Sequence, residues 1–158
     1  MLTLDPPADA APTLVIAIGN PSRGDDALGP AAAERLTAFA LPGVEVLTDF
    51  QLQVEHALDL LGRRRVVFID ASVGIDAPFA LTPLAPAADT GVSTHALAPA
   101  AVLHSFCALT GKPAPEAWLL AIRGQAFDLG APMSDTAQHH LALALEALSA
   151  HLAQAPAR

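Results

Sequence analysis

A chain of 158 residues, 53% of them hydrophobic, has the size of one domain and enough apolar side chains for a sizeable core. Its 16 acidic and 8 basic side chains give a formal net charge of −8, which argues against a nucleic-acid partner and against a polybasic membrane anchor. No apolar run approaches the ~20 residues that span a bilayer, so we expect no membrane association.

The chain alternates segments of strand-like and helix-like sequence. Short apolar runs ended by turn signals predict strands over residues 13–18, 44–47, 66–69 and 118–122, with an edge strand over 79–84. Helices are predicted over residues 28–39, over 98–109 and from about 134 to the tail, where leucines at 141, 145, 148 and 152 share one face. This order predicts an α/β fold with a mostly parallel sheet and helices on both faces.

Three local patterns carry further expectations. Val54, Leu58 and Leu61 are spaced for one face of another helix, which Gly62 would end. Asp25 and Asp26 precede the 28–39 helix, and one of them is expected to cap it. The run Arg63-Arg64-Arg65 is expected to offset the dipole of the preceding helix and to stay solvated rather than to bind phosphate.

Both ends of the chain are predicted to be flexible. Residues 1–12 hold three prolines and no basic residue, a composition unlike that of a secretory signal. The segment 154–158 is expected to be a loose tail. We therefore expect a single domain over residues 13–153, flanked by two flexible extensions.

Cys107 is the only cysteine, so no intrachain disulfide forms, which fits a reducing compartment. We expect a cytoplasmic monomer. The thiol lies between Phe106 and Ala108 in an apolar helical stretch, which favours a buried, inert side chain over a nucleophile.

Polar residues follow the predicted strands, and ligands of open α/β sheets bind beyond the carboxyl ends of the strands. Asn20, Asp49, Asp70 and Arg123 come directly after strands, and Asp25 and Asp26 come one short loop later. His95 joins them if the third helix begins there. Two carboxylates and an imidazole, from Asp26, Asp70 and His95, suit a borderline cation such as nickel or zinc.

Each of these residues also has a purely structural interpretation, which the sequence leaves open. Asp26 fits a helix cap, Asp70 fits a bond to a neighbouring turn, and His95 fits an ordinary helix start. The five remaining histidines lie in predicted helices and are expected at core edges or in solvent: His56, His104, His139, His140 and His151.

Other site types lack support in the sequence. No dinucleotide fingerprint and no Walker phosphate loop occur. Neither the Gly-x-Ser-x-Gly elbow of serine hydrolases nor the His-Glu-x-x-His helix of zinc peptidases is present.

The opening motif resembles that of the nickel–iron hydrogenase maturation endopeptidases. The likeness lies in Val15-Ile16-Ala17-Ile18-Gly19-Asn20, then Gly24-Asp25-Asp26, then Gly29. It continues, in order over roughly residues 13–150, through Asp49, the strand ending in Asp70, Thr94-His95, and Arg123-Gly124 followed by Phe127 and Gly130.

The resemblance implies a three-layer α/β/α sandwich around a twisted, mostly parallel sheet. It implies a peptidase that removes a C-terminal extension from the hydrogenase large-subunit precursor after nickel insertion. Matched by motif, the metal ligands are Asp26, Asp70 and His95, and the nickel is supplied by the substrate. Asp25 and Asp49 are then candidate proton acceptors.

The sequence departs from the family pattern at three places. Asp26 stands where Glu is frequent, which keeps the ligand type but shortens it by one methylene. Ala17 replaces a common glycine. The segment Phe50-Gln51-Leu52-Gln53 follows Asp49 in place of a Gly-Gly-Thr-like turn, which indicates a distinct hydrogenase subgroup and leaves the partner open.

Two other functions fit parts of the same pattern. A nickel-binding maturation chaperone that does not cut would use the same three ligands. A small-molecule hydrolase at the same sheet edge would need a deep, closed pocket rather than an open groove.

Overall fold

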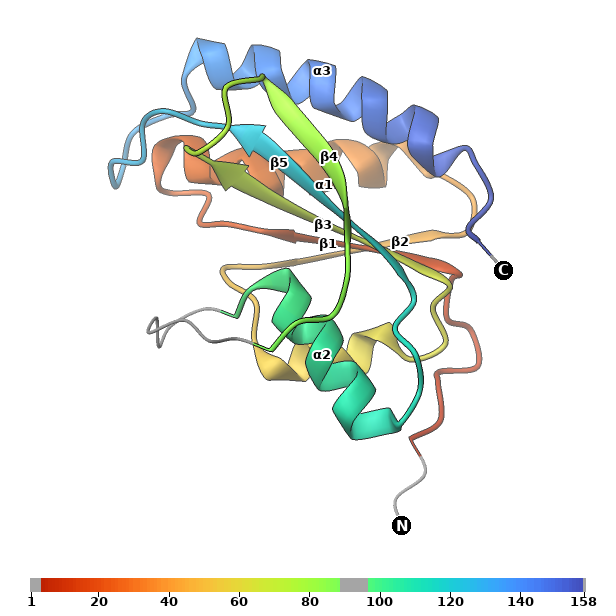
Figure 1. Cartoon of the computed structure of the whole chain (residues 1–158). Helices are drawn as coiled ribbons and strands as arrows, with labels where there is room; N and C mark the ends of the chain where they lie inside the picture. Colours follow the sequence, from red (N-terminus) through yellow and green to blue (C-terminus); the bar gives the residue numbers. More distant parts are fainter. Residues whose placement is uncertain (1–3, 89–96, 158) are drawn as a thin grey trace.

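The computed structural model describes residues 4–88 and 97–157, and a five-stranded sheet lies at its centre (Figure 1). The strands are β1 (Thr13–Ile18), β2 (Val44–Asp49), β3 (Arg65–Ser72), β4 (Phe79–Leu84) and β5 (Glu116–Arg123). The α-helices are α1 (Leu28–Phe39), α2 (Pro99–Thr110) and α3 (Asp135–Leu152), and two 3₁₀ helices are η1 (Gly24–Ala27) and η2 (Val54–Leu60).

The strand order is β2-β1-β3-β5-β4. Strands β2, β1, β3 and β5 are parallel to one another. Strand β4 pairs antiparallel with β5 at one edge of the sheet, where Pro83 lies opposite Trp118. The expected α/β architecture is therefore confirmed. No helix within residues 4–88 and 97–157 is long and apolar enough to cross a bilayer.

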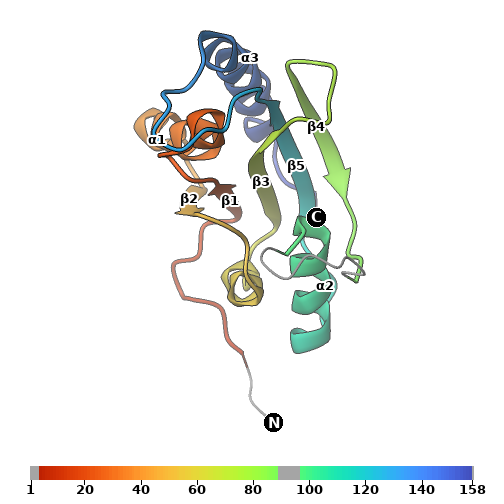
Figure 2. The ribbon, with the colours of Figure 1, turned by 90° about the vertical axis from the view of Figure 1, so that its left-hand side faces the viewer.

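Helices cover both faces of the sheet (Figures 1 and 2). Val15 and Ala17 of β1 pack with α1 and α3, whereas Leu14 and Ile16 pack with η2 and α2. Strand β1 is buried along its whole length, because successive side chains point to opposite faces and both faces are covered. The predicted leucine face of α3 is confirmed, since these four side chains are at most 8% exposed: Leu141, Leu145, Leu148 and Leu152.

Strands β2, β3 and β5 extend beyond their predicted bounds. The pairing of β3 with β5 continues from Asp70 opposite Ala121 to Ser72 opposite Arg123. Asp70 thus lies within a strand, near its carboxyl end, because the backbone pairing continues past the apolar run that marks the strand in the sequence.

The expected helix after β2 is a 3₁₀ helix, and its predicted apolar face is wrong. Val54 and Leu58 are 49% and 44% exposed, whereas Ala57 and Leu60 are buried. Leu61, the third residue of the predicted face, is 7% exposed, so the prediction is confirmed for this residue alone.

The expectation of solvated arginines is also wrong for two of the three. Arg63 pairs with Glu45 and donates to the carbonyl of Asp59, while only Arg64 is exposed. Arg65 is 2% exposed and lies in β3. Its guanidinium donates hydrogen bonds to three backbone carbonyls at the end of α3, that of Gln154 at 2.9 Å and those of His151 and Leu152 at 3.4 Å. Arg65 therefore offsets the dipole of α3 rather than that of the helix before the arginine run.

The described parts of both predicted extensions contact the domain. The Pro12 carbonyl accepts the N–H groups of Arg64 and Arg65 at 2.8 and 3.1 Å. At the other end, the N–H of Ala157 donates to the carboxylate of Glu116 at 2.8 Å. The division into a domain and two extensions stays a prediction.

Arg65→Ala is expected to lower the free energy of unfolding by about 2–4 kcal/mol, because it leaves buried carbonyls at the end of α3 without donors. Its neighbour Arg64, whose side chain is exposed, supplies the matched control, and Arg64→Ala is expected to change stability by less than about 0.5 kcal/mol. Urea denaturation of both variants measures the difference. Equal stability of the two variants would contradict this role of Arg65.

Candidate functional site

The carboxyl ends of the four parallel strands bring the predicted site residues to one edge of the sheet. The arrowheads of β3 and β5 point to the left in Figure 1, and Figure 2 looks onto that side. Asp49 pairs with Ile18 at the ends of β2 and β1, and Asp70 lies near the end of β3. His95 lies outside the described residues, so its place at this edge stays a prediction.

Two glycines of the opening motif let the loop after β1 fold tightly against the strand. A Cβ on Gly19 would lie 2.0 Å from the carbonyl oxygen of Asp26, and Gly19 has a φ of +148°. A Cβ on Gly29 would lie 2.1 Å from the carbonyl oxygen of Ile18. Only glycine permits both approaches, and they hold Asp26 next to the end of β1.

Asp26 is partly buried, and its carboxylate accepts the N–H of Asn20 at 2.7 Å. This bond orients the side chain across the turn from Asn20. Asp26 does not cap α1, whose N-cap residue is Ala27 without a side-chain bond. The predicted capping role is therefore wrong for Asp26.

Asp70 lies in the electrostatic field of Asp26. Burial raises the pKa of Asp70 to about 6, the charge of Asp26 contributes in the same direction, and the N–H of Ala71 opposes them. A cation placed beside Asp70 would stabilise its ionised form. Within the described residues no third His, Cys, Asp or Glu side chain joins them. The donor chemistry of this pair fits a divalent metal that still needs further ligands.

Asp25 is fully buried, and four donors surround its carboxylate. The N–H groups of Gln125, Ala126 and Ser134 donate at 2.8, 3.1 and 2.8 Å, and the Ser134 hydroxyl donates at 2.9 Å. Burial acts to raise the pKa of Asp25, but these hydrogen bonds outweigh it and lower the pKa. The expected helix cap is wrong here too, because Asp25 instead joins the loop after β1 to the loop after β5.

Asp49 forms a carboxylate–imidazole pair that the sequence analysis missed. One oxygen accepts the N–H of Phe50 at 2.7 Å, and the other lies 3.3 Å from Nε2 of His56. The Gln53 N–H donates to Nδ1 of His56 at 2.8 Å. The same Nδ1 lies 3.2 Å from the carbonyl oxygen of Gln53, so the start of η2 holds the ring with Nε2 facing Asp49. The sequence signal was the capping box of Gln53 and His56, which begins η2 beside Asp49.

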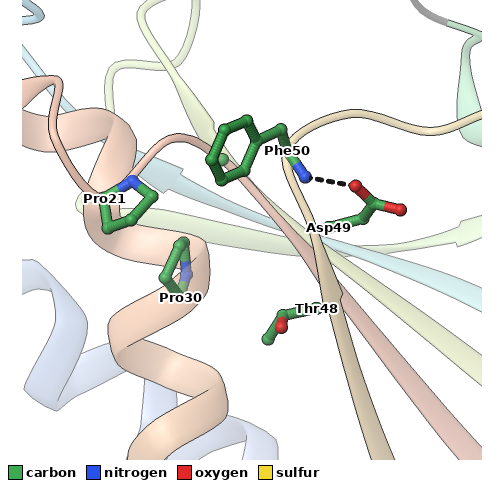
Figure 3. A pocket seen from close by; sticks show the side chains of 6 residues that line it. Pro21, Pro30, Thr48, Asp49 and Phe50 are labelled. Carbon is green, nitrogen blue, oxygen red and sulfur yellow. Dashed lines mark hydrogen bonds between the residues drawn. The ribbon is translucent and has the colours of Figure 1, made fainter.

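A cavity of about 240 Å³ opens beside Asp49 (Figure 3). Pro21, Pro30 and Phe50 form apolar walls, and Thr48 and Asp49 supply polar groups. This volume lies below the roughly 300–1,000 Å³ typical of small-molecule pockets. It suits one or two side chains of a longer substrate.

Cys107 lies away from this edge. It is partly buried on α2 and lines a different cavity, together with Leu84, Glu116 and Trp118, near the start of β5. The geometry gives its thiol no access to Asp26 or Asp70.

Asp70→Asn is expected to stabilise the metal-free protein at about pH 8 by roughly 1–3 kcal/mol, because it removes a charge that folding disfavours. The folded-state pKa of about 6 lies above the ordinary 3.8, so the wild type loses stability as the pH rises through this window. The gain is therefore expected to vanish near pH 4. Thermal denaturation in a chelator across this pH range measures it. A destabilised Asp70→Asn at every pH would contradict the assignment.

Comparison with known proteins agrees with the sequence motifs. No protein-family model matches the chain, and no curated protein does. Among solved structures, the [NiFe] hydrogenase maturation protease HycI from Thermococcus kodakarensis is 25% identical, with a TM-score of 0.69, over 93% of this chain and 96% of that one. The hydrogenase maturating endopeptidase HybD from E. coli is 23% identical, with a TM-score of 0.71, over 89% and 91%. The resemblance to the nickel–iron hydrogenase maturation endopeptidases is thus confirmed along nearly the whole chain.

Proposed function

We propose that this protein is an endopeptidase that removes the C-terminal extension from a nickel-loaded hydrogenase large-subunit precursor. The observation that carries the proposal is the likeness to a [NiFe] hydrogenase maturation protease over 93% of the chain. The meeting of Asp26 and Asp70 at the carboxyl edge supports it, because this edge is where an α/β sheet binds its ligands. A cytoplasmic location and a monomeric state remain predictions.

In this proposal Asp26, Asp70 and His95 bind the nickel that the substrate carries. Leu97, two positions after His95, donates its N–H to the carbonyl of Leu52 at 3.3 Å, and Leu52 follows β2. This contact places Leu97 beside the loop that follows β2. The bound nickel would position the scissile peptide and polarise its carbonyl or activate a water molecule.

We assign proton transfer to Asp49 rather than to Asp25. The Asp49 side chain is 47% exposed and lies beside the cavity, so a substrate can reach it. His56 would orient its carboxylate through Nε2. Asp25 is saturated by four donors and is fully buried, which suits it to holding the loop of Asp26 in place.

The two competing functions make different demands on this site. The cavity beside Asp49 is small for an enclosed small-molecule substrate, which disfavours the small-molecule hydrolase. A nickel chaperone would bind the precursor without shortening it. Precursor length before and after incubation separates the chaperone from the peptidase.

Purified precursor with nickel is expected to be shortened by the protein, and the same precursor without nickel is expected to stay intact. Mass spectrometry of the large subunit measures this.

Asp26→Ala, Asp70→Ala and His95→Ala are each expected to reduce cleavage by at least about 100-fold, since each removes one ligand. The control Cys107→Ala is expected to cleave within about twofold of wild type. Equal cleavage of both precursor forms would refute nickel docking.

Asp49→Asn and Asp25→Asn are expected to fail in different ways. Asp49→Asn removes the proton acceptor, so kcat is expected to fall about 100-fold or more with unchanged stability. Asp25→Asn places an amide among N–H donors, so the free energy of unfolding is expected to fall by about 1–3 kcal/mol. Single-turnover cleavage and thermal denaturation measure the two effects. A fully active Asp49→Asn would overturn the assignment of the proton acceptor.

A further inference from the structure

The three most exposed large apolar side chains of the described residues are Phe50, Val73 and Leu129, at 66%, 73% and 69%. Phe50 follows β2, Val73 follows β3, and Leu129 lies in the loop between β5 and α3. All three loops leave the carboxyl ends of parallel strands, which lie on the side seen in Figure 2, so these residues belong to the edge that holds the candidate site. We call this set the apolar rim.

Backbone hydrogen bonds fix the loop of Leu129 beside the loop of Asp26. The N–H of Gly130 donates to the carbonyl of Ser22 at 2.7 Å, and the N–H of Asp25 donates to the carbonyl of Ala126 at 2.7 Å. Phe50 directly follows Asp49 and walls the cavity beside it. Two members of the apolar rim therefore adjoin the loops of Asp49 and Asp26, and the third, Val73, follows the strand that carries Asp70.

Exposed carboxylates accompany each member of the rim. Asp49 precedes Phe50, Asp76 follows Val73 in the same loop, and Asp128 precedes Leu129, and all three are exposed. Arg23 and Arg123 are the exposed basic residues nearest in sequence to these loops. The Arg123 guanidinium donates to the backbone carbonyl of Asp76, not to its carboxylate. Acidic groups therefore outnumber basic ones around the rim, in line with the net charge of −8.

The cavity alone offers little binding surface, since 240 Å³ accommodates only one or two side chains. A protein substrate must gain the rest of its binding energy from the surface around the site. Aromatic side chains such as Phe50 are enriched in such interfaces, and complementary charges at their margin increase the association rate. Phe50, Val73 and Leu129 are exposed and do not contribute to the hydrophobic core of the free protein.

We infer that the apolar rim docks onto the folded precursor, on an apolar patch bordered by Lys and Arg side chains next to the cleaved segment. This inference rests on the proposed function. Phe50, Val73 and Leu129 supply apolar contact, and the neighbouring carboxylates attract the basic border.

The test compares two multiple variants with nickel-loaded precursor. Val73→Ser/Leu129→Ser removes the two members of the rim that do not wall the cavity. Phe39→Ser/Leu109→Ser is the matched control, because these side chains are 53% and 56% exposed but lie at helix ends that lead to the amino-terminal edge of the sheet. The rim variant is expected to raise KM and the precursor Kd by about tenfold or more, with kcat within about threefold of wild type. The control is expected to match wild type.

A charge variant tests the basic border separately. Asp76→Asn/Asp128→Asn is expected to slow association with the precursor by about threefold or more at low salt and to have little effect at high salt. Stopped-flow binding at both salt concentrations measures this. An unchanged salt dependence would overturn the proposed basic border of the partner.

The outcomes separate the rim from the proposed function. Wild-type cleavage with an unchanged Kd in the rim variant overturns the rim and leaves the peptidase assignment intact. If the wild type binds the precursor without cleaving it and the rim variant no longer binds, the docking role of the rim is supported and the peptidase assignment is overturned. A wild type that neither binds nor cuts the precursor overturns both. Thermal denaturation of each variant confirms that the fold is retained.

Discussion

The buried carboxylate of Asp25 accepts four hydrogen bonds from a segment about a hundred positions further along the chain, and these bonds join the loops after β1 and β5. Asp26 is its immediate neighbour. The position of this candidate ligand therefore depends on a contact that forms only when β5 and α3 are in place. The tight approaches at Gly19 and Gly29 fix the same loop from the side of β1. A site built in this way exists only in the complete fold.

Much of the fold was readable from local patterns. The bounds predicted for β1, β4 and α1 are confirmed, because turn signals and glycine or proline residues mark where these elements begin or end. The errors arose where long-range contacts override local pattern. Arg65 resembles a solvated charge in sequence, yet it is buried against the end of α3, whose carbonyls no local pattern brings near it. The predicted face of η2 was wrong at Val54 and Leu58, which are exposed, and right at Leu61, which is buried.

The candidate site was predictable to a similar extent. The rule that ligands bind at strand ends places Asp49 and Asp70 at one edge, and the parallel pairing confirms that placement. The role of Asp25 was not predictable, since its donors come from residues 125–134 and sequence spacing carries no information about them. His56 was likewise assigned to core edges or solvent, and its approach to Asp49 depends on the turn that starts η2. Local sequence signals thus identified which residues lie at the carboxyl edge of the sheet. They did not identify which of these side chains are held by hydrogen bonds within the protein.

The edges of the sheet have a consequence for a protein that handles an unfolded peptide tail. An unpaired strand edge can recruit an extended chain, which leads to strand addition and aggregation. On the β4 edge, Pro83 has no N–H to offer an incoming strand. On the β2 edge, the charge of Glu45 is fixed by its pair with Arg63. Each edge strand therefore carries a residue that disfavours strand addition.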